Sequence, residues 1–462
     1  MSNKQIISHP YIPNTVEKVR QSMLETIGVK EPGDLYVDIP AAVKLNEPLD
    51  LPEALSEFEL KRHVEGMLAK NVSCGEKLSF LGAGCYQHHV PSVCKEIGSR
   101  GEFVTAYDAG YYADQGKYQA VFEYLSMMAE LLESDVVSIT YDGHCAASSS
   151  LLMAARVTGR KKVLVASSIS VDKRSHMNNF CRPVLEIIDL KYDQQSGHID
   201  LSALENNLTE EVAAVYFESP NYLGIIETQG EEIAQIAHKY GALCVVGVNP
   251  ISLGVLEPPM AYGADIVCGD VQPFGLGMNY GGGLCGFIST SDDERFVAEH
   301  PSPPLSVFPS ENGDLFFSKP TKRFSSYIKR ESSPDFTGSL QTLSSITAGV
   351  YLALMGPEGL REIGETMIQR CLYAIKLLNS VPGVCATRFT GPKFNEFVVD
   401  FNATGKTVAE INAFLSEKGI FGGKDLSKEF PVLGESALYC VTEIHSAEDI
   451  KTLAKAIEEA VK

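Results

Sequence analysis

Residues 136–150 read VVSITYDGHCAASSS, in which a β-branched run, an Asp-Gly turn and a run of small residues follow one another. The run Val136–Thr140 predicts a buried strand, and the small residues from Cys145 onward predict a helix. Gly143 stands at the tight turn between them. Free backbone N–H groups and the helix dipole at such a junction favour an anion such as a phosphate, and His144 could stack on a flat ring. A helix start that only packs closely on a sheet would have the same sequence pattern, because turns of small residues recur in α/β sheets.

Outward from this stretch, short apolar runs alternate with helical patterns over residues 76–340. The further strands that we expect are Lys162–Ala166, Val212–Phe217, Ala242–Val248, Asp265–Cys268 and Leu284–Ile288. Strands separated by helices indicate an α/β domain with a mainly parallel sheet, and their nearly continuous apolar character predicts burial on both faces. Residues 300–340, rich in Ser, Pro, Phe and Lys, predict a long loop at the end of this large domain.

Two smaller regions flank the large domain. Residues 1–75 predict an N-terminal arm with helices over Val16–Ile27 and Leu55–Leu68. Residues 341–462 predict linking helices, broken near Gly356, and a small C-terminal α+β domain of β-α-β-α order.

Charge and cysteine usage limit the possible partners and compartment. Of 462 residues, 39 are Lys or Arg and 59 are Asp or Glu, which gives a formal charge of −20. Such a chain lacks the basic face that nucleic acids and anionic membranes require. No apolar run approaches the length of a membrane span, and the N-terminus MSNKQIISHP does not resemble a leader peptide. The 11 cysteines include no C-x-x-C pair, so we expect reduced thiols in a cytoplasmic protein.

A second stretch, residues 265–283, reads DIVCGDVQPFGLGMNYGGG. In pyridoxal-phosphate enzymes of the aspartate aminotransferase type, a lysine follows a strand at this place. The chain has no lysine between Lys239 and Lys319, and Gln272 stands where that lysine is expected. An amide cannot form a Schiff base. The preceding strand, Ala242–Val248, and Asn249 after it also offer no Asp for the cofactor's ring nitrogen. We therefore predict a vestigial cofactor pocket formed by Asp142, Gly143, His144, Cys145 and Gln272.

Several long motifs in a fixed order resemble the P-protein family of the glycine cleavage system, in its two-chain form. The resemblance covers the chain from His9 onward. The motifs are FLGAGCYQHHVP at 80–91, YDG at 141–143, SPNYLG at 219–224, NPISLG at 249–254, YGADIVCGDVQP at 262–273, YLALMGPEGLRE at 351–362 and FNEF at 394–397.

This resemblance implies the fold of type I pyridoxal-phosphate-dependent transferases. It also implies that the chain is the alpha subunit, which lacks the cofactor lysine, and that a beta subunit carries lysine and pyridoxal 5'-phosphate in an α2β2 assembly. The assembled enzyme would decarboxylate glycine and pass the aminomethyl group to the lipoyl arm of H protein. This chain would shape the partner's site, and Tyr107, Gln115 and Arg330 are the candidate residues at the shared site or interface.

The sequence departs from the family in three segments. Residues 108–114 differ from the family's TPYQxExS stretch and are one residue shorter, residues 332–340 are also altered, and His144-Cys145 replace Ala-Thr. Two alternatives to a glycine decarboxylase subunit therefore remain. The chain could be a divergent paralogue that acts on another amine or carrier, or a pseudoenzyme with a structural or regulatory role. A self-sufficient pyridoxal-phosphate enzyme fits poorly, because no lysine ends the relevant strand. Adjacent His88 and His89 do not have the spacing of metal ligands, so no metal site is expected.

Overall fold

The computed structural model describes residues 11–45, 47, 49–104, 114–281, 285–319, 325–336 and 340–462, and of residues 13, 330 and 332 it describes the backbone. The chain forms two compact units, Met1–Asn71 and Val72–Lys462. The first unit contains the two expected helices, α1 (Glu17–Ile27) and α2 (Glu57–Leu68). A capping box starts α2, because the backbone N–H of Ser56 donates to the Glu59 carboxylate at 3.0 Å and the Ser56 hydroxyl accepts from the Glu59 backbone.

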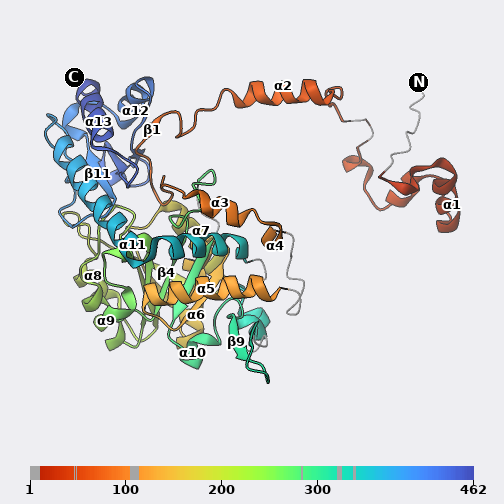
Figure 1. Ribbon diagram of the computed structural model, residues 1–462, viewed down its shortest axis with the longest axis horizontal. Coiled ribbons are helices and arrows are strands. Elements are labelled where there is room, and N and C mark those ends of the chain that lie inside the picture. Colours follow the sequence, from red (N-terminus) through yellow and green to blue (C-terminus); the bar gives the residue numbers. More distant parts are fainter. Residues whose placement is uncertain are drawn as a thin grey trace. The chain divides into compact units, whose positions relative to one another are not determined.

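A seven-stranded sheet forms the centre of the second unit (Figure 1). Its strands stand in the order β2-β8-β7-β6-β5-β3-β4, and all neighbours are parallel except β8, which is antiparallel to both β2 and β7. The strands are β2 (Val136–Thr140), β3 (Lys162–Ala166), β4 (Glu186–Leu190), β5 (Val212–Ser219), β6 (Leu243–Val248), β7 (Ile266–Asp270) and β8 (Gly286–Thr290). The predicted mainly parallel sheet is confirmed.

Helices cover both faces of this sheet, as the apolar strands require. Alternate strand residues such as Val246 and Phe217 pack on one face with α5 (Gln115–Leu132) and α9 (Gly230–Lys239). Their neighbours Val245 and Tyr216 pack on the other face with α6 (Gly143–Thr158) and α7 (Val171–Cys181). The remaining helices of this region are α3 (Ser92–Gly98), α4 (Gly101–Val104), α8 (Leu201–Asn207) and α10 (Glu294–Val297). Burial on both faces is thus confirmed.

A second core surrounds a three-stranded antiparallel sheet of order β11-β14-β13. The strands are β11 (Glu396–Asp400), β13 (Lys424–Asp425) and β14 (Ser436–Cys440), with α12 (Val408–Glu417) and α13 (Ala447–Ala460) packed beside them. Two residues of an earlier segment join this region, because β1 (Leu78–Ser79) pairs in parallel with β12 (Ile420–Phe421).

The long helix α11 (Thr342–Leu378) contributes to both cores. Figure 1 shows its first part beside α5, which it contacts. The expected break is present as a kink at Gly356, whose φ of 58° is not helical, directly before Pro357.

The prediction of a loop over residues 300–340 is wrong in part. Strands β9 (Ser306–Pro309) and β10 (Leu315–Ser318) form an antiparallel hairpin, and a 3-10 helix, η7, spans Ser326–Ser332. Short apolar runs on either side of Gly313, whose φ is 85°, carry this hairpin. The side-chain amide of Gln115 holds it to α5 by donating to the carbonyl of Phe317 at 2.8 Å and accepting from its N–H at 2.9 Å.

Replacing Gly224 by Ala should destabilise the fold more than replacing Gly405 by Ala. Both glycines have positive φ, 83° and 72°. A Cβ at Gly224 would overlap the backbone carbonyl of Glu396 on β11, whereas a Cβ at Gly405 meets nothing within 4 Å. Backbone strain should lower the free energy of unfolding by about 1 kcal/mol in both variants, and the overlap by a further 1–3 kcal/mol, roughly. Urea denaturation measures the difference, and equal losses would show that Gly224 does not need this close approach.

Candidate functional site

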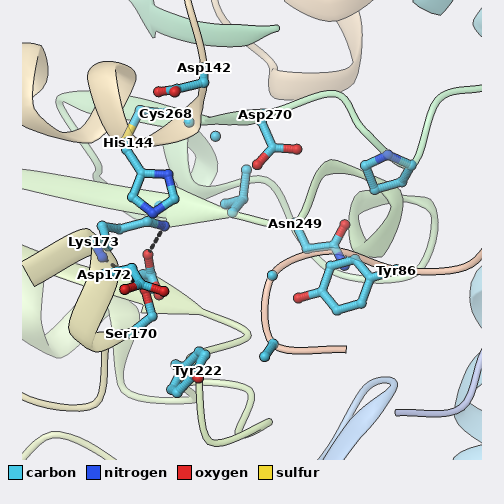
Figure 2. Close-up of a pocket in the computed structure, with 18 of the residues that line it drawn as sticks. Tyr86, Asp142, His144, Ser170, Asp172, Lys173, Tyr222, Asn249, Cys268 and Asp270 are labelled. Carbon is cyan, nitrogen blue, oxygen red and sulfur yellow. Dashed lines mark hydrogen bonds and ion pairs between the residues drawn. The ribbon is translucent and has the colours of Figure 1, made fainter. Parts of the chain in front are cut away.

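A cavity of about 420 Å³ lies at the carboxyl ends of the central strands. In open parallel sheets this is the edge at which ligands bind. Figure 2 shows side chains from several elements converging on it. The polar residues that carry its chemistry are Asp142, His144, Lys173, Glu218, Asn249 and Asp270.

The start of α6 forms one wall of the cavity. Asp142 is extended and caps the helix, with its carboxylate accepting from the backbone N–H of Cys145 at 2.7 Å. A Cβ at Gly143 would come within 2.9 Å of the Asp270 carboxylate, so a larger residue there would displace the Asp270 side chain. The helix start predicted from the sequence is present, but a carboxylate of the chain itself takes a first-turn amide that a phosphate could have used.

The only lysine that lines the cavity, among the residues that the structure describes, is Lys173 near the start of α7. Its ammonium group forms an ion pair with Glu218 at the end of β5. The Tyr216 hydroxyl donates to the same Glu218 oxygen at 3.0 Å. Burial alone would lower the pKa of Lys173, but the Glu218 charge and hydrogen bond raise it above its ordinary value. Lys173 is therefore a charged partner of Glu218 and a poor amine nucleophile.

Two further ionisable groups are shifted by the cavity. Burial raises the pKa of Asp270 to about 6. Burial, with the nearby Lys173 charge, lowers the pKa of His144 below its ordinary value. His144 is then a neutral ring near pH 7, beside a carboxyl group that titrates in the mildly acidic range.

Cys145 does not line the cavity, and faces His176 across 3.8 Å from its Sγ to the ring Nε2. The other ring nitrogen of His176 lies 2.8 Å from the Ser148 hydroxyl. Burial raises the pKa of the Cys145 thiol to about 12, so it is not a thiolate at neutral pH.

Gln272 is 1% exposed and also stays out of the cavity, where Pro273 takes the lining position. Its Nε2 donates to the carbonyls of Tyr86 and Gly277 at 2.8 and 3.0 Å, and its Oε1 accepts from the Tyr86 N–H at 3.1 Å. The residue at the expected lysine position is therefore fully used in backbone contacts.

Of the three residues predicted at the shared site, the structure describes the side chain of Gln115 only. Gln115 is the first residue of α5 and binds the β10 backbone, away from the residues that line the cavity. Arg330 lies in η7, but its side chain is outside the structural description, and Tyr107 lies outside the described residues.

Sequence reasoning missed Lys173, Glu218 and Asp270. Glu218 and Asp270 each stand at the carboxyl end of a buried parallel strand, which is a usable signal for a site. Lys173 follows the helix cap Ser170 in a stretch without a motif, so nothing local marks it. Within the described residues there is no group of three or more metal-ligating side chains, and no helix has the length and apolarity to cross a membrane.

The donor set does not fit pyridoxal 5'-phosphate. The first-turn amide of α6 is capped by Asp142, the lysine is paired with Glu218, and the end of β6 is followed by Asn249 in place of a carboxylate. A phosphate would also meet the carboxylates of Asp172 and Asp270 in the lining, while the charge of Lys173 is already paired with Glu218. Like charges in a partly enclosed space repel, so the cavity opposes a phosphate-bearing cofactor.

Asp270→Asn should flatten part of the pH dependence of stability. The folded pKa, about 6, is above the ordinary value of 3.8, so the folded state binds more protons between these limits. The resulting contribution to the free energy of unfolding is complete below about pH 4 and is lost as the pH rises through 6. Thermal unfolding between pH 4 and 7 should show a steeper fall for the natural chain than for Asp270→Asn.

Asp425→Asn is the matched control, because Asp425 also accepts the backbone N–H two residues on, that of Ser427 at 2.8 Å. Asp270 accepts that of Gln272 at 3.0 Å. If both variants had the pH profile of the natural chain, the Asp270 carboxyl would not titrate as its burial requires.

The family model of the glycine cleavage system P-protein matches residues 9–457. A protein of Staphylothermus marinus named probable glycine dehydrogenase (decarboxylating) subunit 1 is 37% identical over 465 residues, covering 98% of each chain. A crystal structure of a glycine decarboxylase P-protein in inhibitor-bound form superposes with a TM-score of 0.83 at 33% identity, covering 98% of this chain and 100% of that one.

A Burkholderia pseudomallei sphingosine-1-phosphate lyase shares the fold, with a TM-score of 0.65 at 14% identity over 92% of this chain and 94% of that one. The fold is that of type I pyridoxal-phosphate-dependent enzymes, as expected. The match of the family model over nearly the whole length places this chain in the glycine cleavage system P-protein family.

Proposed function

We propose that this chain is the alpha subunit of a two-chain glycine decarboxylase and holds no cofactor of its own. The observation that carries the proposal is the cavity at the strand ends, in which Asp142 caps the helix and the lysine is paired with Glu218. The relatives named subunit 1 match the chain almost from end to end, and such a name implies a second subunit.

In this account the partner, subunit 2, carries the lysine and pyridoxal 5'-phosphate in an α2β2 assembly. The assembly decarboxylates glycine and passes the aminomethyl group to the lipoyl arm of H protein. This chain supplies a scaffold for the partner's site, and Tyr107, Gln115 and Arg330 are the residues that we place at the shared site or interface. Gln115 would act there through the hairpin, because both ends of its side-chain amide bind the Phe317 backbone.

A reducing cytoplasm is the compartment that we infer. All 11 cysteines are free thiols, and seven of them are buried. Free buried thiols are ordinary in reducing compartments, where disulfides rarely persist.

Co-expression with subunit 2 tests the proposal. The purified pair should catalyse exchange of carbon dioxide with the glycine carboxyl group in the presence of lipoylated H protein, whereas either chain alone should be inactive. The isolated chain mixed with pyridoxal 5'-phosphate should show no Schiff-base absorbance band. A stable pair without exchange on glycine would instead favour the divergent paralogue or the pseudoenzyme, and activity of this chain alone would overturn the proposal.

The Gln115→Ala variant tests the role of this residue in the same carbon dioxide exchange assay. Loss of both bonds to Phe317 should release the hairpin, and we expect an exchange rate lower by about tenfold. Gln119→Ala is the control, since Gln119 lies one turn further along α5 and binds only the exposed Glu123 at 3.0 Å. Equal effects of the two substitutions would remove Gln115 from the proposed shared site.

A further inference from the structure

Residues 81–86, named here the clasp segment, run from β1 to the mouth of the cavity. The segment lines the cavity with Ala83, Gly84 and Tyr86. At one end the clasp segment follows β1, which pairs with β12 beside the three-stranded sheet. At the other end, Tyr86 binds Gln272, which follows β7 of the seven-stranded sheet. Figure 2 shows Tyr86 among the side chains that line the cavity.

Gln272 holds the clasp segment from the side of the large sheet. Its amide makes two bonds to the backbone of Tyr86, one to the N–H and one to the carbonyl, as a neighbouring strand would. Its third bond, to the Gly277 carbonyl, orients the side chain. The side chain is buried, so no water can replace these bonds without opening of the structure.

Glu396, the first residue of β11, holds the clasp segment from the other side. One carboxylate oxygen accepts from the Ala83 N–H at 2.6 Å, and the other accepts from the Tyr86 hydroxyl at 3.0 Å. Ala83 has a φ of 63°, which a non-glycine residue rarely adopts without fixed contacts. A Cβ at Gly82 would overlap the Glu396 carboxylate, so the approach depends on a glycine there.

We propose that Gln272 and Glu396 are positioning residues that fasten the clasp segment over the cavity, and that the Glu396 fastening releases a proton when it opens. The role of Gln272 is thus a structural one at the place where related folds carry a lysine. This inference goes beyond the proposed function and does not depend on the reaction that the partner performs.

The proton linkage follows from the burial of Glu396, which is 3% exposed. Burial raises the pKa of its carboxyl group to about 7, against an ordinary value of 4.5, and outweighs the bonds from Ala83 and Tyr86, which lower this pKa. The closed clasp therefore binds the proton more tightly than an opened, hydrated one, so opening becomes easier as the pH rises from 4.5 to 7 and levels off above it. The titratable and charged groups that face Glu396 are Tyr86, Tyr222, Cys371, Cys440, Lys424 and Glu218.

Hydrogen exchange of the full-length chain, resolved to the Ala83 and Tyr86 amides, tests the clasp. Opening constants are obtained by dividing observed rates by the intrinsic rates at each pH. Gln272→Ala should raise the opening constant at Tyr86 at least tenfold while exchange in β6 stays unchanged. Gln229→Ala, which removes a half-buried amide bonded to Ile199 and Glu227, should leave Tyr86 as in the natural chain. Unchanged exchange at Tyr86 in Gln272→Ala would overturn the proposal.

Glu396→Gln tests the proton linkage, because an amide has the same shape and does not titrate. In the natural chain the opening constant at Ala83 should rise at least tenfold between pH 5 and pH 7.5, whereas in Glu396→Gln it should stay flat. Glu435→Gln is the control, since Glu435 accepts the Val408 N–H at 2.8 Å elsewhere in the small sheet region. It should keep the natural pH profile. A natural profile in Glu396→Gln, or a flat one in the natural chain, would overturn the linkage.

The Tyr86→Phe variant tests the Glu396 fastening if Gln272→Ala or Glu396→Gln prevents folding. The ring and the backbone bonds to Gln272 remain, while Glu396 loses one of its two donors. We expect a severalfold higher opening constant at Ala83 at every pH. No change at Ala83 would remove the Tyr86 hydroxyl from the clasp and with it the proposed Glu396 fastening.

Discussion

The hydrogen bond from the Cys145 N–H to the Asp142 carboxylate is the constraint on which the chemistry of this chain depends. The amino end of a helix attracts anions, and in folds of this type it faces the cavity at the strand ends. Here the carboxylate of Asp142, at the start of the same helix, takes the place of an external anion. Asp270 stands against Gly143 and adds a second negative charge at that place, and Glu218 takes the charge of Lys173. One first-turn amide and the lining lysine, which a phosphate could have used, are therefore already paired within the chain.

The framework around that cavity is nevertheless complete. The seven-stranded sheet is buried on both faces, and the small antiparallel sheet approaches it through Gly224, the clasp segment and α11. Because burial of apolar strands stabilises the fold without any cofactor, the scaffold can persist after its chemistry is lost. The same backbone then serves as a surface for a partner, which is the role that we propose for this subunit.

Strands buried on both faces were predictable because their signal is local. The ranges expected for β2 and β3 match the structure residue for residue, since each is an apolar run ended by a turn. Strand β4, EIIDL at the sheet edge, has charged residues among its apolar ones and was not expected. The strands β9 and β10 have four residues each, and so short an apolar run does not distinguish a strand from a loop. The contacts of Gln272 with Tyr86 join residues 186 positions apart, so no local pattern could reveal them.

We propose that the catalytic cofactor of the assembly is bound by subunit 2 and not by this chain. Borohydride reduction of the assembled pair converts a lysine-bound cofactor into a stable secondary amine, and mass spectrometry of the separated chains then locates it. We expect a phosphopyridoxyl group on one lysine of subunit 2 and none on this chain. A phosphopyridoxyl group on this chain, at Lys173 or at any other lysine, would contradict it.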